Sequence, residues 1–294
     1  MRYHIKHLTR YEYAEPVVKC LNLAHVIPRN SHRQRCEQHR IQVNPTPQTR
    51  HERTDYFGNR FFYFSIERAH HALEVSSESW VDVKSDAALP SLDFGSTCIE
   101  TQQRLLQSKH PDDLLAREFI LDSPAIVLDA DIRDYASTSF NRDRTVLAAV
   151  RDLTRRIYTD FKYSPGSTTT STPLADVLRL GEGVCQDFAH LAIGCVRSMG
   201  FPARYVSGYL ETLPPPGKEK LIGSDESHAW FAVYIPGEGW HEFDPTNDTM
   251  AREQHITTAW GRDYTDVAPL RGVIYGGGDH QQLTVSVDVT RTDA

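Results

Sequence analysis

Polar and apolar positions alternate with a period of two along the first part of the chain. The clearest runs are residues 3–13 and 61–66, in which aromatic and β-branched side chains are frequent. Turn residues such as Asn44-Pro45 and Gly58-Asn59 lie between the runs. Short runs of this kind separated by turns predict an antiparallel β domain over residues 1–84.

The hydrophobic period becomes helical further along the chain. Residues 84–98 are rich in Ser, Asp, Pro and Gly and are predicted to be a linker. Apolar residues then recur at intervals of three and four in four segments: residues 114–121, 132–140, 145–161 and 174–180. Asp143 is the predicted cap of the third helix. The pattern places a linker and helical segment at residues 85–142 and a compact core at residues 143–294.

A glycine-rich turn over residues 181–184 leads into a further helix, which begins at Cys185. Its apolar stripe is followed by Gly200 and Pro202, which end it. The unpaired N–H groups and the positive dipole at a helix start favour a thiolate over a thiol, so Cys185 is a candidate nucleophile. The alternative is a small buried residue, which is the favoured interpretation for Cys195 inside the stripe.

After this helix the period returns to two. Strands are predicted over four segments: residues 203–210, 227–235, 240–244 and 283–289. A long loop with a proline run occupies residues 211–226. Helices followed by an antiparallel sheet in one unit indicate the α+β class.

His228 and Asp244 lie on this predicted hairpin at equal, even distances from Pro236. A reversal centred on Pro236 would place them opposite each other on one face of the sheet. Across a cleft from Cys185, His228 could accept the thiol proton while Asp244 holds the imidazole, which would complete a catalytic triad. Taken alone, a strand histidine such as His228 is more often a structural residue. An aspartate before a proline, such as Asp244, is more often a turn former.

Composition narrows the possible functions of the chain. It has 294 residues, 39% of them hydrophobic, and a formal net charge of −7, which speaks against a nucleic-acid or anionic-membrane partner. No apolar run approaches the ~18 residues of a membrane span, and the first residues lack the apolar core of a secretory signal, so we expect a cytoplasmic protein. Five cysteines without close pairs, and histidines without metal-binding spacing, predict neither disulfides nor a metal site.

Several motifs carry a resemblance to a known family. Residues 183–190 (GVCQDFAH), 227–230 (SHAW) and 239–247 (GWHEFDPTN) resemble the three core motifs of the transglutaminase-like superfamily, and residues 202–209 (PARYVSGY) resemble a fourth segment. The opening residues 7–13 and 55–59, and the later residues 261–267, are similar to the bacterial transglutaminase-like proteins that carry an N-terminal β region. The resemblance covers nearly the whole chain.

The resemblance implies a papain-like core, in which a cysteine heads a helix packed on an antiparallel sheet. It places the nucleophile on Cys185, the base on His228 and the third member on Asp244. Trp230, Tyr163 and Tyr264 are candidate substrate contacts, although Trp230 could equally fill the sheet edge. Arg204 is a further candidate for the border of the cleft. Asp263 and Asp266 could suggest a cation site, but carboxylates in a loop are usually solvated.

The implied activity is that of a cysteine protease-like hydrolase without a cofactor, acting on a peptide or protein through a thioester. Two alternatives stay open: an acyltransferase or transglutaminase that joins the acyl group to an amine, and a binding module that has kept the fold without turnover. The family resemblance also suggests a partner of the peptide-ligase type. The N-terminal β domain could dock the substrate or shield the core.

Overall fold

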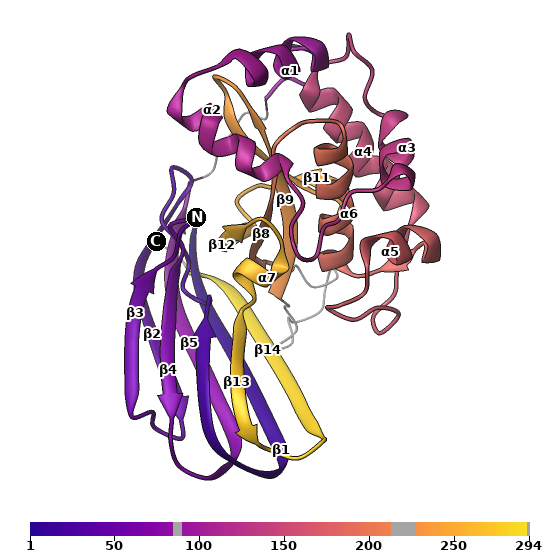
Figure 1. The fold of residues 1–294 in the computed structure, drawn as a ribbon. Helices are drawn as coiled ribbons and strands as arrows, with labels where there is room; N and C mark the ends of the chain where they lie inside the picture. Colours follow the sequence, from indigo (N-terminus) through magenta and orange to yellow (C-terminus); the bar gives the residue numbers. More distant parts are fainter. Residues whose placement is uncertain (85–89, 213–226, 293–294) are drawn as a thin grey trace, which may run out of the picture.

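The computed structural model describes residues 1–84, 90–212 and 227–292. Parts of the predicted linker over residues 84–98 and of the predicted loop over residues 211–226 therefore lie outside the described residues. Within them, no helix is both long and apolar enough to cross a membrane. The predicted α+β class is confirmed: two antiparallel sheets and a group of helices make up the fold (Figure 1).

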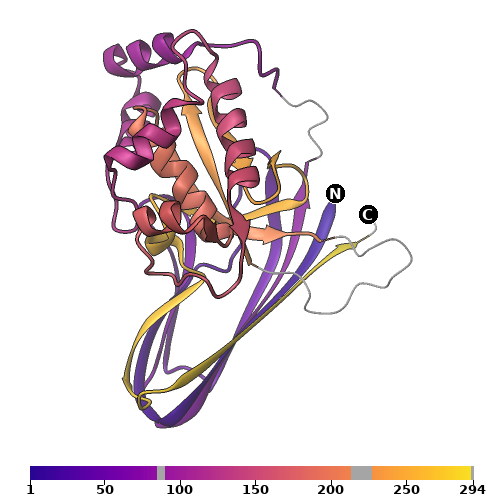
Figure 2. The same cartoon turned by 90° about the vertical axis from the view of Figure 1, so that its right-hand side faces the viewer.

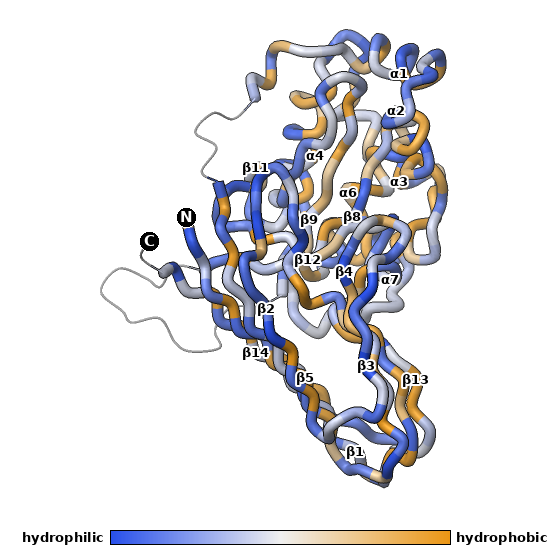
Figure 3. The backbone as a smooth tube through the Cα atoms, turned by 90° about the vertical axis from the view of Figure 1, so that its left-hand side faces the viewer, coloured by the Kyte–Doolittle hydropathy of each residue, from blue (hydrophilic) through white to orange (hydrophobic). Residues whose placement is uncertain are grey.

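The first sheet is built around one long strand. In the described residues it has seven strands: β1 (Arg2–Ala24), β2 (Gln34–Asn44), β3 (Thr49–Thr54), β4 (Arg60–Ile66), β5 (His70–Val83), β13 (Leu270–Gly276) and β14 (Gln281–Thr292). The first half of β1 pairs with β5 and β14, and its second half pairs with β4 and β13. Buried positions alternate with more exposed ones along the first half of β1, as predicted, and along β5. Figure 3 shows hydrophobic and hydrophilic residues interspersed along these two strands.

The second sheet carries the candidate catalytic residues His228 and Asp244. Within the described chain its order is β11-β10-β9-β8-β12, formed by β8 (Ala203–Leu210), β9 (Ser227–Ile235), β10 (Gly239–Asp244), β11 (Thr249–Met250) and β12 (His255–Gly261). The predicted bounds of β8 and β9 agree with the structure. The short parallel pair β6 (Lys162–Tyr163) and β7 (Glu182–Gly183) precedes the nucleophile helix.

The helices α3 to α6 lie together on one side of the second sheet, α1 and α2 lie above it, and the first sheet extends away from them as a curled sheet (Figures 1 and 2). They are α1 (Cys98–Gln107), α2 (Pro111–Ala116) with a 3-10 turn (Arg117–Ile120), α3 (Ala130–Ser137), α4 (Val146–Asp160), α5 (Leu174–Leu180), α6 (Cys185–Ser198) and α7 (Tyr264–Val267). The cap of α4 is Thr145, whose hydroxyl accepts the Ala148 N–H, and not the predicted Asp143. Thr145 stands directly before the first helical residue, where a capping side chain can reach the free N–H groups.

The predicted division of the chain differs from the structure in two places. Leu105, Ile126 and Ile132, from the predicted linker and helical segment, are buried in the same core as α6 and β9. At the other end, β13 and β14 complete the first sheet, although residues 143–294 were predicted as one catalytic core. Pairing between distant segments leaves no local periodic signal, so neither feature was visible in the sequence.

The two sheets are packed against each other through a small apolar cluster. Tyr209 and Ile256 of the second sheet are buried with residues of the first sheet, Tyr3 and Ile5 among them. Polar contacts reinforce the junction: the Tyr209 hydroxyl lies 2.9 Å from Nδ1 of His7. The first sheet thereby supports the strands β8 and β12.

Candidate active site

The loop before α6 fixes the position of Cys185, the first residue of that helix. The Asp187 carboxylate accepts hydrogen bonds from the backbone N–H of Val184 (2.8 Å) and from the hydroxyl of Thr168 (2.6 Å). A Cβ on Gly183 would lie 2.8 Å from Cβ of Asp187, so only glycine fits this turn. Asp187 thus braces the helix start, and the partly buried Cys185 thiol stands at the free N–H end of α6.

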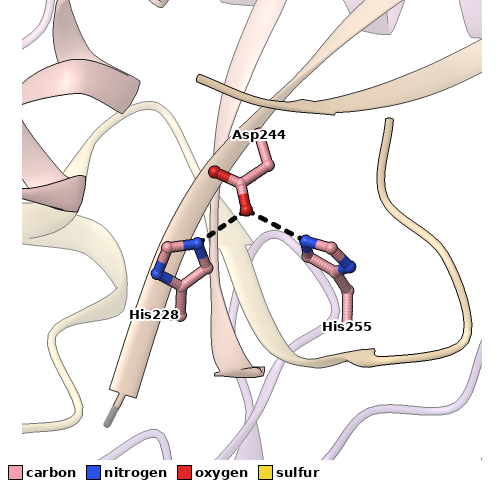
Figure 4. Close-up of side chains that lie close together, drawn as sticks. All are labelled: His228, Asp244 and His255. Atoms are coloured by element: carbon pink, nitrogen blue, oxygen red, sulfur yellow. Dashed lines mark hydrogen bonds and ion pairs between the residues drawn. The ribbon is translucent and has the colours of Figure 1, made fainter. Parts of the chain in front are cut away.

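His228 and Asp244 meet at one end of the hairpin (Figure 4). Nε2 of His228, in β9, lies 2.8 Å from Oδ2 of Asp244, the last residue of β10. Asp244 is completely buried, and its other oxygen accepts the backbone N–H groups of Thr246 and Asn247. These contacts hold the carboxylate in one orientation toward the imidazole.

The register of the hairpin is shifted from the predicted one. Phe243 pairs with Phe231 and Gly239 with Ile235, which places Asp244 level with Trp230 and not with His228. The turn is centred one residue later than Pro236, on Gly237, whose φ of +83° suits glycine. Since the resulting shift is even, His228 and Asp244 still share a face of the sheet and lie diagonally across it.

The Cys185 side chain lies near the His228 imidazole and acts on its charge. Burial lowers the pKa of His228, but the charge and hydrogen bond of Asp244, followed by the interaction with Cys185, outweigh it and raise the pKa well above its usual value. Burial raises the pKa of Asp244, but the neighbouring His228 and His255 lower it well below its usual range. Because Nε2 of His228 is directed at Asp244, Nδ1 is the nitrogen that can accept the thiol proton.

A second imidazole, His255, reaches the same carboxylate oxygen. Its Nε2 lies 3.1 Å from Oδ2 of Asp244 (Figure 4), and its Nδ1 accepts the backbone N–H of Arg252. This second contact leaves the ring proton on Nε2, so His255 donates to Asp244. The sequence interpretation missed His255, because the strand β12 that carries it has no motif and was not predicted.

His228, Asp244 and His255 are also the cluster of possible metal ligands in the described part of the chain. A metal would need a free lone pair on both Nε2 atoms. The Arg252 contact puts a proton on Nε2 of His255, and that nitrogen lies at hydrogen-bonding distance from Asp244. The three side chains are therefore better suited to hydrogen bonds with one another than to binding a metal.

Tyr163 and Tyr264, two of the predicted substrate contacts, differ in how far they are exposed. Tyr163 is 44% exposed and pairs in β6 with Gly183, directly before the nucleophile loop. Tyr264, the first residue of α7, is partly buried, and its ring lies 6.3 Å from that of Tyr205. Both residues thus remain near the helix start of Cys185 as candidates for substrate binding.

Trp230 has a different place from the expected one. It is 0% exposed, its ring is stacked with His228 at 6.1 Å, and its Nε1 donates to Glu242 (2.9 Å). A fully buried indole has no surface for a substrate, so the expectation of a substrate contact is corrected. Trp230 supports the imidazoles of His228 and His255 from behind.

Arg204 also lies away from the nucleophile. Along β8, Tyr205 contacts His190 of α6, so its neighbour Arg204 points to the opposite face of the sheet. Asp263 is buried and caps α7 through the Thr265 N–H, so the expectation that it is solvated is corrected.

Comparisons with known proteins find similarity to one family along most of the chain. The model of the bacterial transglutaminase-like N-terminal region matches residues 3–82, and that of the transglutaminase-like superfamily matches residues 133–245. An uncharacterized protein of Mycobacterium tuberculosis is 43% identical over 293 residues, which are 98% of this chain and 92% of the relative. A protein-glutamine gamma-glutamyltransferase of Pseudomonas aeruginosa is 34% identical over 100 residues, 32% of this chain and 15% of that enzyme.

Among solved structures, a candidate cysteine protease from Cytophaga hutchinsonii superimposes with a TM-score of 0.77. The superposition covers 100% of this chain and 91% of the other, at 23% sequence identity. This likeness shows that the two chains share the arrangement of both sheets and of the helices.

Proposed function

Because the chain belongs to the transglutaminase-like superfamily, we propose that it is a cysteine-dependent hydrolase of amide bonds in a peptide or protein substrate. The observation that carries the proposal is the position of His228, which lies near Cys185 and is hydrogen-bonded to the buried Asp244. An imidazole held between a thiol and a carboxylate is the arrangement that activates a cysteine nucleophile.

In the first half of the reaction, Nδ1 of His228 takes the thiol proton of Cys185, and the thiolate attacks the carbonyl carbon of the substrate. The developing oxyanion is stabilised by the backbone N–H of Cys185 at the start of α6. Collapse of this intermediate breaks the C–N bond, and His228 gives its proton to the leaving amine. Asp244 keeps the ring oriented and stabilises the imidazolium while it exists.

In the second half, His228 removes a proton from water, which attacks the thioester on Cys185. The acid product leaves and the thiol is restored. Hydrolysis is favoured over transfer because nothing in the sequence indicates an amine site, and nothing in it resembles the calcium loops of the animal transglutaminases. The exposed Tyr163 and the partly buried Tyr264 are proposed to border the acyl side of the cleft.

Transfer to an amine is the second candidate. It is favoured by one observation, the similarity of 100 residues to a protein-glutamine gamma-glutamyltransferase. Transfer and hydrolysis share the thioester and differ only in which nucleophile resolves it. A binding module without turnover is less favoured, since Cys185, His228 and Asp244 are all present, with Cys185 near His228 and His228 bonded to Asp244.

Mass spectrometry of the products separates these candidates. The protein and its Cys185→Ala variant are incubated with unfolded casein, and separately with a glutamine peptide and a labelled primary amine. We expect new peptide or acid termini with the parent protein alone. Incorporation of the amine in place of hydrolysis would identify a transferase. Equal products from the Cys185→Ala variant, or none from the parent, would contradict a cysteine-dependent enzyme.

A further inference from the structure

A cleft of about 1540 Å³ opens on the face of the second sheet that is turned away from α6. Its walls come from the start of β2, from α2 and from the hairpin β9–β10, with Arg204 and Trp260 among the lining residues. Neither Cys185 nor His228 lines it, but His255, which donates to Asp244, does, and Arg204 shares its sheet face with Trp230 and His228. The cleft thus adjoins the His228 side of the triad without including the nucleophile.

Arg204 is an unusual buried cation in this cleft. It is 6% exposed, and its guanidinium lies between two indole rings, 4.2 Å from the centre of Trp240 and 3.7 Å from that of Trp260. Its Nε has no hydrogen-bond partner among the described residues. Burial lowers the pKa of Arg204 to about 9, while Glu242 raises it. Buried polar groups in proteins are normally hydrogen-bonded, so a buried guanidinium whose Nε has no partner calls for an explanation.

Three carboxylates that line the cleft are engaged by other groups. Glu242 accepts the Nε1–H of Trp230, and among the described residues it pairs with Arg33 at 3.6 Å. Asp113 accepts the hydroxyl of Tyr234 at 2.6 Å, and Glu118 is likewise bonded to a tyrosine. Within the described chain, none of these three carboxylates is bonded to Arg204.

We propose that Arg204, with Arg33 at the rim, binds a carboxylate that is carried on a flat apolar group. A planar guanidinium offers two parallel N–H donors to a carboxylate, which a point charge such as Lys cannot match. The walls supply the apolar part: Trp240 is in edge contact with Phe119 at 5.3 Å, and Phe57 lies in the same cleft. Aryl carboxylates and the carboxyl end of a peptide with an aromatic last residue both have this chemistry.

Isothermal titration calorimetry with matched acids and amides tests the proposal. The four probes are benzoate, benzamide, N-acetylphenylalanine and N-acetylphenylalanine amide, at equal ionic strength. We expect saturable binding of a carboxylate, with its amide at least about tenfold weaker. Binding of N-acetylphenylalanine alone would identify a peptide end, and binding of both acids a general aryl carboxylate site. Equal binding of acids and amides, or no binding of either acid, would overturn the proposal.

Variants locate the site. Arg204→Gln should abolish binding, but it removes a buried side chain, so the decisive variant is Glu242→Gln. This change removes a negative charge beside the proposed site and keeps an acceptor for Trp230, so we expect the carboxylate to bind at least about threefold more tightly. Unchanged or weaker binding would contradict the assignment.

Two control variants test whether binding is specific to this cleft. Arg179→Gln removes an exposed cation that is paired with Asp176 on α5, and it should leave the affinity unchanged. Cys185→Ala should also leave it unchanged, because Cys185 does not line the cleft. A loss of binding in Cys185→Ala would place the carboxylate at the triad and refute a separate site.

Discussion

Replacing Asp244 by asparagine would reverse the hydrogen bonding at the centre of the site. In the structure one oxygen accepts the backbone N–H groups of Thr246 and Asn247. The other oxygen accepts from His228, His255 and the Asn247 side chain. Asparagine can keep its oxygen toward the backbone only by turning its NH₂ group toward these three donors. His228 would then have to move its proton to Nδ1, the nitrogen that faces Cys185.

The size of the effect follows from the burial of the pair. Asp244 is 0% exposed, and removing one partner of a buried ion pair costs about 3–5 kcal/mol. A cost of this size reduces the population of the His228 imidazolium at least about 100-fold. An ordinary thiol with a pKa of about 8.5 is only about 0.3% ionised at about pH 6, which limits the loss of thiolate to roughly 300-fold. We therefore expect the alkylation of Cys185 at about pH 6 to slow by about two orders of magnitude in Asp244→Asn.

The assay is the rate of iodoacetamide alkylation of each cysteine, followed by peptide mass spectrometry between about pH 5 and pH 9. Cys36, which is partly exposed and far from Asp244 in the first sheet, serves as the internal reference. Asp113→Asn is the matched control, because Asp113 is also buried and hydrogen-bonded but lies outside the triad. If folded Asp244→Asn alkylated Cys185 at the parent rate at about pH 6, the role given to Asp244 would be wrong.

Three further changes test the surroundings of the triad. Gly183→Ala is expected to destabilise the protein by about 1–3 kcal/mol, because the added Cβ would lie 2.8 Å from Cβ of Asp187; urea unfolding measures the loss, and an unchanged midpoint would contradict this close contact. His255→Phe removes a donor to Asp244, so we expect a loss of about 1–3 kcal/mol in the free energy of unfolding and slower alkylation of Cys185. His255→Gln should recover part of both the stability and the alkylation rate. Equal behaviour of the two variants would rule out the hydrogen bond as the cause. Stability should also fall as the pH drops from about 6.5 to 4, because burial lowers the pKa of His190 to about 4 while the unfolded residue takes up a proton near its usual pKa. Unfolding midpoints measured against pH should fall less steeply in His190→Gln. Parallel curves would exclude His190 as a source of the pH dependence.

Local periodicity predicted those elements whose apolar pattern is decided within a short segment. The bounds of β8 and β9 agree with the prediction, and α5 and α6 begin at the predicted residues. The face shared by His228 and Asp244 was predictable, whereas their pairing depended on the turn. A turn centred on Gly237 in place of Pro236 moved the pairing by two positions and preserved the face.

Features that depend on distant pairing could not be predicted in this way. The strands β13 and β14 read as ordinary alternating or irregular sequence, and only the fold shows that they pair with β1. The same applies to Arg204, whose motif suggested the border of the catalytic cleft. The alternation of side chains along β8 places it on the face turned away from α6, which it shares with His228, between two indole rings that come from β10 and β12.

His255 shows where a triad inferred from motifs is incomplete. A carboxylate that is fully buried must receive several hydrogen bonds, because each unpaired oxygen lone pair costs free energy. The predicted motif around Asp244 supplied His228 and the neighbouring Thr246 and Asn247, and these leave room at Oδ2 for one more donor. That a further donor exists therefore follows from the burial of Asp244. That it is His255 follows only from the pairing of β12 with β8, which brings the first residue of β12 beside the end of the hairpin.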